Sequence, residues 1–176
     1  LKGLERAGVL DDVMPELVPM KGRMMHSRDG ELTYQPYGKD DSEYGNSVSR
    51  AGLNKILVAR AEETGRVDFH FSHRASDVDH EENIVTFIDE STDKTVKVKA
   101  RRIIGTDGGG SAIRKSMMEL NGYQCSTAPL EYGYKELAIP PGPGGSFLIE
   151  KEALHIWPRG EFMQIALPNF EGGFTR

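Results

Sequence analysis

The chain has 176 residues, of which 38% are hydrophobic and 28% are charged, and its formal net charge is −5. This mixture is typical of a soluble globular protein and argues against intrinsic disorder. The acidic balance, without a basic stripe, argues against nucleic-acid binding. A single cysteine, Cys125, excludes an internal disulfide framework and a multi-cysteine metal site.

The first 18 residues have the apolar spacing of two short helices that Gly8 separates. Asp11 or Asp12 is the expected cap of the second helix. The chain then alternates in the manner of a β-hairpin. Its strand, turn and return strand are predicted at residues 19–27, 28–30 and 31–37.

This hairpin places an arginine beside a tyrosine. If Gly30 is left-handed, Arg23 pairs with Gln35, and Tyr37 becomes a diagonal neighbour of Arg23 on the same face. An arginine and a tyrosine in this arrangement can clamp a carboxylate. An exposed arginine beside a half-buried tyrosine is an equally good interpretation, because exposed arginine is common.

A helix is predicted over residues 50–63, with Ser49 as its N-cap. Arg50 lies in the first turn, which is not the favoured end for a positive charge. We therefore expect Arg50 to have a partner, either a bound phosphate or a carboxylate from elsewhere in the fold. Strands are expected next at residues 67–71, 84–88 and 94–99.

The run from Arg102 to Gly105 predicts a strand that ends in Asp107-Gly108 and leads into a helix reaching about Leu120. Glycines let a ligand approach the backbone, and a helix N-terminus offers free N–H groups to phosphate. An aspartate at a strand end can accept hydrogen bonds from hydroxyls. An ordinary strand–turn–helix connection with an aspartate cap explains the same residues equally well.

The last third of the chain is predicted to be mainly strands around a loop at residues 140–145. Alternation puts Leu154 and Ile156 on one face and His155 and Trp157 on the other. Ile165 and Leu167 likewise share a face. Core packing is the simplest explanation of these apolar residues. The expected strands are 132–139, 146–150, 153–157 and 162–167.

The order of elements predicts an α/β fold with antiparallel β-structure. The five histidines have no recurrent metal-binding spacing, so we expect no metal site. No apolar run reaches the roughly 20 residues of a membrane span. The chain opens without methionine in a helical pattern and closes where another strand is expected, so we expect it to be an internal part of a longer protein.

Four of these segments resemble, in order and spacing, the kynurenine 3-monooxygenases, a family of FAD-dependent aromatic hydroxylases. The four are the hairpin at residues 19–37, the helix start at Ser49-Arg50, the Asp107-Gly108 motif and the strands at residues 153–167. The segments Val18–Met20 and Leu154–Arg159 are more specific for this family than the Asp-Gly motif. The resemblance implies part of a Rossmann-like FAD-binding layer and part of an antiparallel substrate-binding sheet. The FAD-binding part comprises residues 1–18 and 45–125, and the substrate-binding part comprises residues 19–44 and 126–176.

The resemblance also implies roles for individual residues. Arg23 and Tyr37 match the residues that bind the substrate carboxylate. Arg50, Asp107 and Gly108 match positions that contact FAD, and the family's FAD-contacting leucine falls on Ala75, which is a departure from the pattern. The residues that match the lining of the aromatic-ring pocket are Leu154, Ile165 and Leu167. The resemblance implies no catalytic side chain within this chain.

For a full-length protein, the resemblance implies hydroxylation of L-kynurenine to 3-hydroxykynurenine with FAD, NADPH and O2. The glycine-rich dinucleotide-binding segment and a later Gly-Asp segment are not in this sequence. We therefore expect the isolated chain to be inactive, to bind FAD weakly at best and to self-associate through unpaired sheet edges. The expected location is the cytoplasm in a bacterium, or the outer mitochondrial membrane through a missing C-terminal part in a eukaryote. The alternatives are a flavin hydroxylase acting on a phenolic acid and a non-catalytic binding domain with the same fold.

Overall fold

The computed structural model describes residues 1–175, which form two compact units. The first unit comprises residues 1–67 together with the chain from residue 133 onward, and the second comprises residues 68–132. The mixture of helices with antiparallel strands confirms the predicted fold class. The predicted division into FAD-binding and substrate-binding parts concerns what each segment binds, and it stays a prediction.

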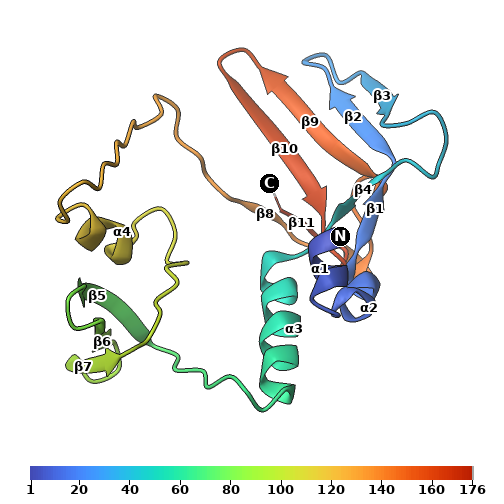
Figure 1. Cartoon of the computed structure of the whole chain (residues 1–176). Coiled ribbons are helices and arrows are strands. Elements are labelled where there is room, and N and C mark those ends of the chain that lie inside the picture. The colour runs from blue at the N-terminus through green and yellow to red at the C-terminus, as the bar shows by residue number, and fades with distance from the viewer. Residues whose placement is uncertain (176) are drawn as a thin grey trace. The chain divides into compact units, whose positions relative to one another are not determined.

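A six-stranded sheet with the order β3-β2-β9-β10-β11-β8 forms the centre of the first unit, and β1 pairs with β4 beside it (Figure 1). All neighbouring strands are antiparallel except β2 and β9, which run parallel. The strands of this unit are β1 (Val18–Met20), β2 (Gly22–His26), β3 (Leu32–Pro36), β4 (Gly45–Ser47), β8 (Ala138–Ile139), β9 (Ala153–Arg159), β10 (Phe162–Pro168) and β11 (Phe174–Thr175).

Two tight turns set the register of this sheet. Gly30 has a φ of +88°, and the β2–β3 pairing sets Arg23 opposite Gln35, as the sequence predicts. Between β9 and β10, Gly160 has a φ of +72° in a two-residue turn, and Arg159 therefore pairs with Phe162. Both positions favour glycine because an L side chain rarely adopts a positive φ.

The register divides the side chains of this sheet between two faces. We call them the Arg23 face and the His155 face, after one residue of each. The His155 face carries the core, because the fully buried side chains alternate along β9, β10 and β11 on that side. Its buried residues are Ala153, His155, Ala166, Pro168 and Phe174.

The helices of the first unit lie at the chain start and after β4. Ser49 caps α3 by accepting a hydrogen bond from the Gly52 N–H, which confirms the prediction. The predicted aspartate cap on α2 is wrong, since Val9 holds the N-cap position and no side chain caps that helix. The elements are α1 (Lys2–Arg6), α2 (Leu10–Val13), the 3-10 helix η1 (Met14–Glu16), α3 (Arg50–Glu63) and the 3-10 helix η2 (Pro143–Gly145).

The second unit is a three-stranded antiparallel sheet, β5-β6-β7, with the short helix α4 packed against β5. Its small core contains Val78 and Val85, and the Ser116 hydroxyl of α4 donates to the Val78 carbonyl at 2.9 Å. The elements are β5 (His73–Asp79), β6 (Ile84–Asp89), β7 (Lys94–Lys99) and α4 (Ala112–Met117). The positions of strands β6 and β7 and the first residue of α4 match the prediction.

Several predicted strands are wrong. Residues 67–71 and 102–105 are irregular, residues 146–150 form a bend, and only the last two residues of 132–139 pair in the sheet. These runs have strand-like composition, but no described strand lies beside them to complete a ladder. Their apolar side chains are correspondingly exposed, as at Ile104 (85%). None of the helices within residues 1–175 has the length and apolar character needed to cross a bilayer.

Candidate functional site

The Arg23 face carries a cation over an aromatic ring. The guanidinium carbon of Arg23 lies 5.4 Å from the centroid of the Tyr37 ring. The Tyr37 N–H donates to the Lys21 carbonyl at 2.9 Å, so the hairpin pairing continues one residue beyond β3. Both side chains remain partly open to solvent. The two predicted carboxylate-binding residues therefore lie together, with free donor capacity on the guanidinium.

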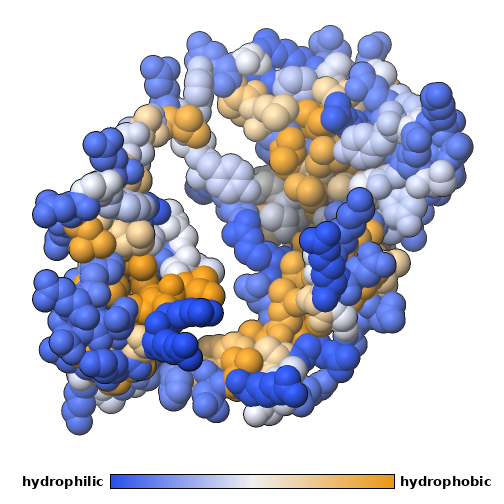
Figure 2. All heavy atoms as spheres, viewed as in Figure 1, coloured by the Kyte–Doolittle hydropathy of each residue, from blue (hydrophilic) through white to orange (hydrophobic). Residues whose placement is uncertain are grey.

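Apolar side chains continue this face across β9 and β10. The parallel pairing of β2 with β9 puts Arg23 beside Leu154, and the β9–β10 hairpin pairs Ile156 with Ile165. Leu154, Ile165 and Leu167 are all half-buried and alternate with the core residues of the opposite face. Figure 2 shows apolar side chains gathered over the β9–β10 hairpin. One sheet face thus offers a cationic end and an apolar end.

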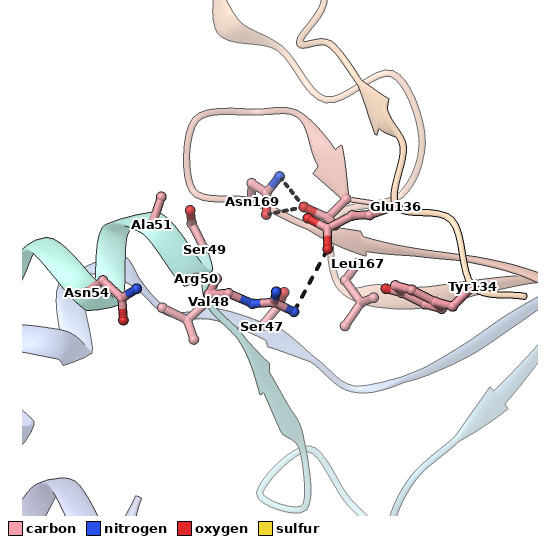
Figure 3. Close-up of a pocket in the computed structure, with 11 residues that line it drawn as sticks. Ser47, Val48, Ser49, Arg50, Ala51, Asn54, Tyr134, Glu136, Leu167 and Asn169 are labelled. Carbon is pink, nitrogen blue, oxygen red and sulfur yellow. Dashed lines mark hydrogen bonds and ion pairs between the residues drawn. The ribbon is translucent and has the colours of Figure 1, made fainter. Parts of the chain in front are cut away.

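A pocket of about 480 Å³ lies between the start of α3 and the end of β10 (Figure 3). The Arg50 side chain is 82% exposed, and its Nη2 lies 3.8 Å from Glu136 Oε2. Across the pocket, Asn169 and Thr175 hydrogen-bond to each other through their side chains. The lining residues are Ser47, Val48, Ser49, Arg50, Ala51, Asn54, Tyr134, Glu136, Leu167, Asn169 and Thr175.

This pocket brings together Arg50, predicted to contact FAD, and Leu167, predicted to line the substrate pocket. Arg50 is a solvent-exposed cation, and its carboxylate neighbour within residues 1–175, Glu136, is at the outer limit of an ion pair. Its guanidinium keeps donors for a further acidic or carbonyl group. The cavity therefore offers a bound ligand guanidinium donors at Arg50 and an apolar side chain at Leu167.

Asp107 in the second unit is used to hold the start of α4. Its carboxylate accepts hydrogen bonds from the Ser111 hydroxyl at 2.6 Å and from the Ala112 N–H at 2.8 Å. The Ser111 hydroxyl is the main cause of the lowered pKa of Asp107, and the N–H groups at the helix start add to it. Ser111 holds the N-cap position of α4 and accepts a hydrogen bond from the Arg114 N–H, so Asp107 supports the helix start from outside the cap position.

The glycine loop after Asp107 is open. Gly108 has a φ of +79°, and a Cβ added at Gly108, Gly109 or Gly110 would meet no atom within 4 Å. Arg114 donates to the Gly108 carbonyl at 3.3 Å and so ties the loop to α4. A cavity of about 310 Å³ adjoins Asp107 and Gly108. The loop leaves room for a ligand to approach its backbone.

Ala75 lies in β5, opposite Phe87 and next to an irregularity in the β5–β6 pairing. It is half-buried and shares the second unit with Asp107 and Gly108, but it is not among the residues that line the cavity beside them. The structure thus groups Arg23, Tyr37, Leu154, Ile165 and Leu167 on one sheet face. No group of three or more His, Cys, Asp or Glu side chains within residues 1–175 is arranged to hold a metal ion.

Two contacts of the first unit involve residues that the sequence analysis did not name as partners. A carboxylate was one of the two partners expected for Arg50, and Glu136 supplies it from an irregular segment that was predicted to be a strand. His26 and His155 share a hydrogen bond although 129 residues separate them. The predicted alternation puts His155 beside Trp157, but no local pattern indicates His26 as their partner.

A family model described as "FAD binding domain" matches residues 1–127, which is more than half of the chain. The chain belongs to the FAD-binding domain family. Curated relatives of this chain include kynurenine 3-monooxygenases from Myxococcus xanthus (47% identical over 175 residues) and Dictyostelium discoideum (43% over 175 residues). Each alignment covers 99% of this chain but only 38% or 37% of the relative, so the chain spans well under half of their length.

Solved structures show the same fold. A flavoprotein/dehydrogenase from Cytophaga hutchinsonii superposes with a TM-score of 0.67 at 18% identity, covering 99% of this chain and 42% of the other. The probable FAD-dependent monooxygenase PqsL from Pseudomonas aeruginosa superposes with a TM-score of 0.63 at 17% identity, covering 99% and 46%. The fold is therefore part of a flavoprotein fold, and FAD is the cofactor of the family.

Proposed function

We propose that this chain supplies the substrate-facing sheet and part of the FAD contact of an enzyme that hydroxylates L-kynurenine at position 3 with NADPH and O2. The activity belongs to a protein that joins this chain to the remaining length of its relatives, since the chain spans 38% of the Myxococcus xanthus protein. We propose that the chain alone does not catalyse this reaction. The proposed substrate comes from the printed name of these relatives, kynurenine 3-monooxygenase.

The single observation that supports this assignment is the composition of the Arg23 face. L-kynurenine combines an α-amino acid carboxylate with an aromatic ketone. The face offers Arg23 stacked on Tyr37 at one end and half-buried Leu154, Ile165 and Leu167 at the other. An arginine fork matches a carboxylate in geometry, and half-buried aliphatic side chains favour an aromatic ring by excluding water.

The residues present fit FAD. Arg50 offers exposed guanidinium donors into a pocket of about 480 Å³, and the open Gly108 loop tolerates close approach of a ligand to its backbone. In this proposal Arg50 is an FAD contact within the first unit. Asp107, Gly108 and Ala75 are proposed FAD contacts within the second unit. Bound FAD, reduced by NADPH, supplies the oxygen activation that the ring hydroxylation requires.

Within this scheme the chain's own residues bind and orient, and none of them transfers a proton. Arg23 and Tyr37 fix the amino-acid end of the substrate, and the apolar side chains hold its ring and exclude water from it. Tight positioning of the ring is the contribution that this part of the protein makes to the rate.

A chimera tests the proposal. Residues 1–175 of this chain replace the aligned segment of the Myxococcus xanthus relative, which is 47% identical over 175 residues. Purified chimera is assayed for bound flavin and for substrate-dependent NADPH consumption with L-kynurenine and with 4-hydroxybenzoate. We expect 3-hydroxykynurenine as the product and no response to 4-hydroxybenzoate.

Three other outcomes would contradict the proposal. Turnover of 4-hydroxybenzoate instead of L-kynurenine favours a phenolic acid hydroxylase. A chimera that folds and binds flavin but uses neither substrate favours a non-catalytic binding domain. Tight binding of FAD by the isolated chain, with turnover of L-kynurenine, would show that the chain is complete as an enzyme.

A further inference from the structure

The seam between β2 and β9 joins the two halves of the proposed substrate face. β2 carries Arg23, and β9 carries Leu154, while the two strands come from opposite ends of the chain. Their parallel ladder contains only four residue pairs, from Gly22–Ala153 to Met25–Ile156. The spacing between the carboxylate clamp and the ring-lining residues therefore depends on a short seam.

A hydrogen-bonded histidine pair lies across this seam on the His155 face. His26 Nε2 and His155 Nδ1 are 2.8 Å apart, and His155 Nε2 is 2.7 Å from the Glu150 carbonyl oxygen. His155 is only 2% exposed, and its ring packs edge-on against Phe174. His26 stacks on Trp157 with ring centroids 4.2 Å apart. The pair is thus fixed by two hydrogen bonds and by aromatic neighbours.

The bonding pattern determines which nitrogen atoms carry protons. A carbonyl oxygen can only accept, so His155 Nε2 must donate to Glu150. In the neutral His155 ring Nδ1 is then an acceptor, and His26 Nε2 must be the donor of the 2.8 Å bond. One chain of donors therefore runs from His26 through His155 to the Glu150 carbonyl.

We propose that His26 and His155 are positioning residues, whose hydrogen bond holds β2 in register with β9 and so sets the distance between Arg23 and the apolar lining of the substrate face. The inference rests on the proposed function for its catalytic consequence only. Neither histidine touches the substrate face, because both side chains lie on the opposite side of the sheet. Arg159 supports the same seam by donating to the His26 carbonyl at 3.1 Å.

Two variants of His26 distinguish the effect of its hydrogen bond to His155 from the effect of its packing against Trp157. His26→Leu keeps an apolar side chain beside Trp157 but leaves the acceptor of buried His155 without its donor. His26→Gln restores an N–H donor near the position of Nε2. In the chimera we expect His26→Leu to raise the KM for L-kynurenine about 5- to 30-fold with a smaller change in kcat, which corresponds to a loss of about 1–2 kcal/mol of binding. We expect His26→Gln to return the KM to within about threefold of the unsubstituted chimera.

An NMR measurement on the isolated chain stands independently of catalysis. Long-range ¹H–¹⁵N spectra at pH 7.5 should show the Nε2–H tautomer for both His26 and His155. Cross-strand contacts between Arg23 and Leu154 should weaken in His26→Leu and persist in His26→Gln. An Nδ1–H tautomer for His155, or unchanged contacts and an unchanged KM in His26→Leu, would overturn the inference. A chimera that never hydroxylates L-kynurenine while these contacts respond as expected would contradict the proposed function instead.

Discussion

The two faces of the six-stranded sheet are built from the same strands but from opposite kinds of side chain. The His155 face is closed around Phe174, which is completely buried together with the polar ring of His155, while Leu32 and Phe162 on the same face stay exposed. The Arg23 face is half-open, with an exposed cation and aliphatic side chains that are only partly covered. Successive residues along one strand therefore contribute alternately to the core and to the open face, because their side chains point to opposite sides of the sheet.

The difference shows where polarity is tolerated. On the closed face a buried histidine is acceptable because both ring nitrogens have partners. On the open face Arg23 has an aromatic neighbour but keeps its donors. A closed, satisfied face stabilises the sheet, and an open face with free donors is available to a ligand. Substitutions on the two faces should therefore affect different measurements.

The largest expected effect is on the stability of the first unit. Phe174→Ala removes a completely buried ring that packs on His155 and Phe147, and should lower the free energy of unfolding by about 3–5 kcal/mol. Leu154→Ala, on the open face, should cost only about 1–2 kcal/mol because its side chain is partly buried. Urea unfolding followed through the fluorescence of Trp157, the single tryptophan, measures both. Equal losses would remove the distinction between the faces.

Substitution of Arg23 should weaken substrate binding and leave the stability of the fold almost unchanged. Arg23→Met in the chimera should raise the KM for L-kynurenine about 10- to 100-fold, as expected for the loss of about 1.5–3 kcal/mol of charge-assisted hydrogen bonding. The urea midpoint should hardly change, because surface substitutions usually cost less than about 0.5 kcal/mol. Arg66→Met, which removes an exposed arginine outside the sheet, is the matched control. If both variants raise the KM equally, the effect is one of net charge and not of a carboxylate site.

Gly22 tests how closely β2 packs against β3 on the His155 face. A Cβ at Gly22 would lie 2.5 Å from the Gln35 carbonyl oxygen and 2.7 Å from the Tyr34 ring. Gly22→Ala should therefore lower the free energy of unfolding by about 1–3 kcal/mol. Gly3→Ala is the control, since a Cβ there meets nothing within 4 Å and alanine favours the helix by up to about 1 kcal/mol. Thermal melts of both variants give the comparison.

Local signals in the sequence account for much of the fold. Gly30 and its neighbours specify the β2–β3 register within a few residues, and Ser49 specifies the start of α3. Both depend on contacts between residues close in the chain. The alternation along β9 likewise predicts which residues share a face with Leu154. Local rules place Arg23 near Tyr37 and put Ile165 and Leu167 on one face. The family resemblance implied that all five residues bind one substrate, and the long-range pairing of β2 with β9 puts them on the same face.

The parts of the fold that were not predicted depend on pairing between residues far apart in the chain. β4 pairs with β1, and β11 pairs with β10 and β8, through two- and three-residue ladders that carry no periodic signal. In contrast, residues 102–105 have strand composition without a described neighbour to pair with. A strand is completed by the strand beside it, so composition alone both misses short strands and predicts false ones. The His26–His155 bond escapes prediction for the same reason.

The smallest expected effect is a pH dependence of stability that arises from His26. Burial, together with the charges of His155 and Arg159, lowers the pKa of His26 below its usual 6.5. On the other neighbouring strand, the titratable side chain on the same face is Tyr34. The unfolded chain therefore takes up the proton first, and the stabilising contribution is present above pH 6.5 and is lost as the pH falls below it.

Wild-type chain should lose stability between pH 7.5 and 5 more steeply than His26→Gln, by at most about 1.4 kcal/mol per pH unit, the limit for one proton. Parallel urea titrations at each pH measure the slopes, and equal slopes would mean that His26 titrates alike in the folded and unfolded chain.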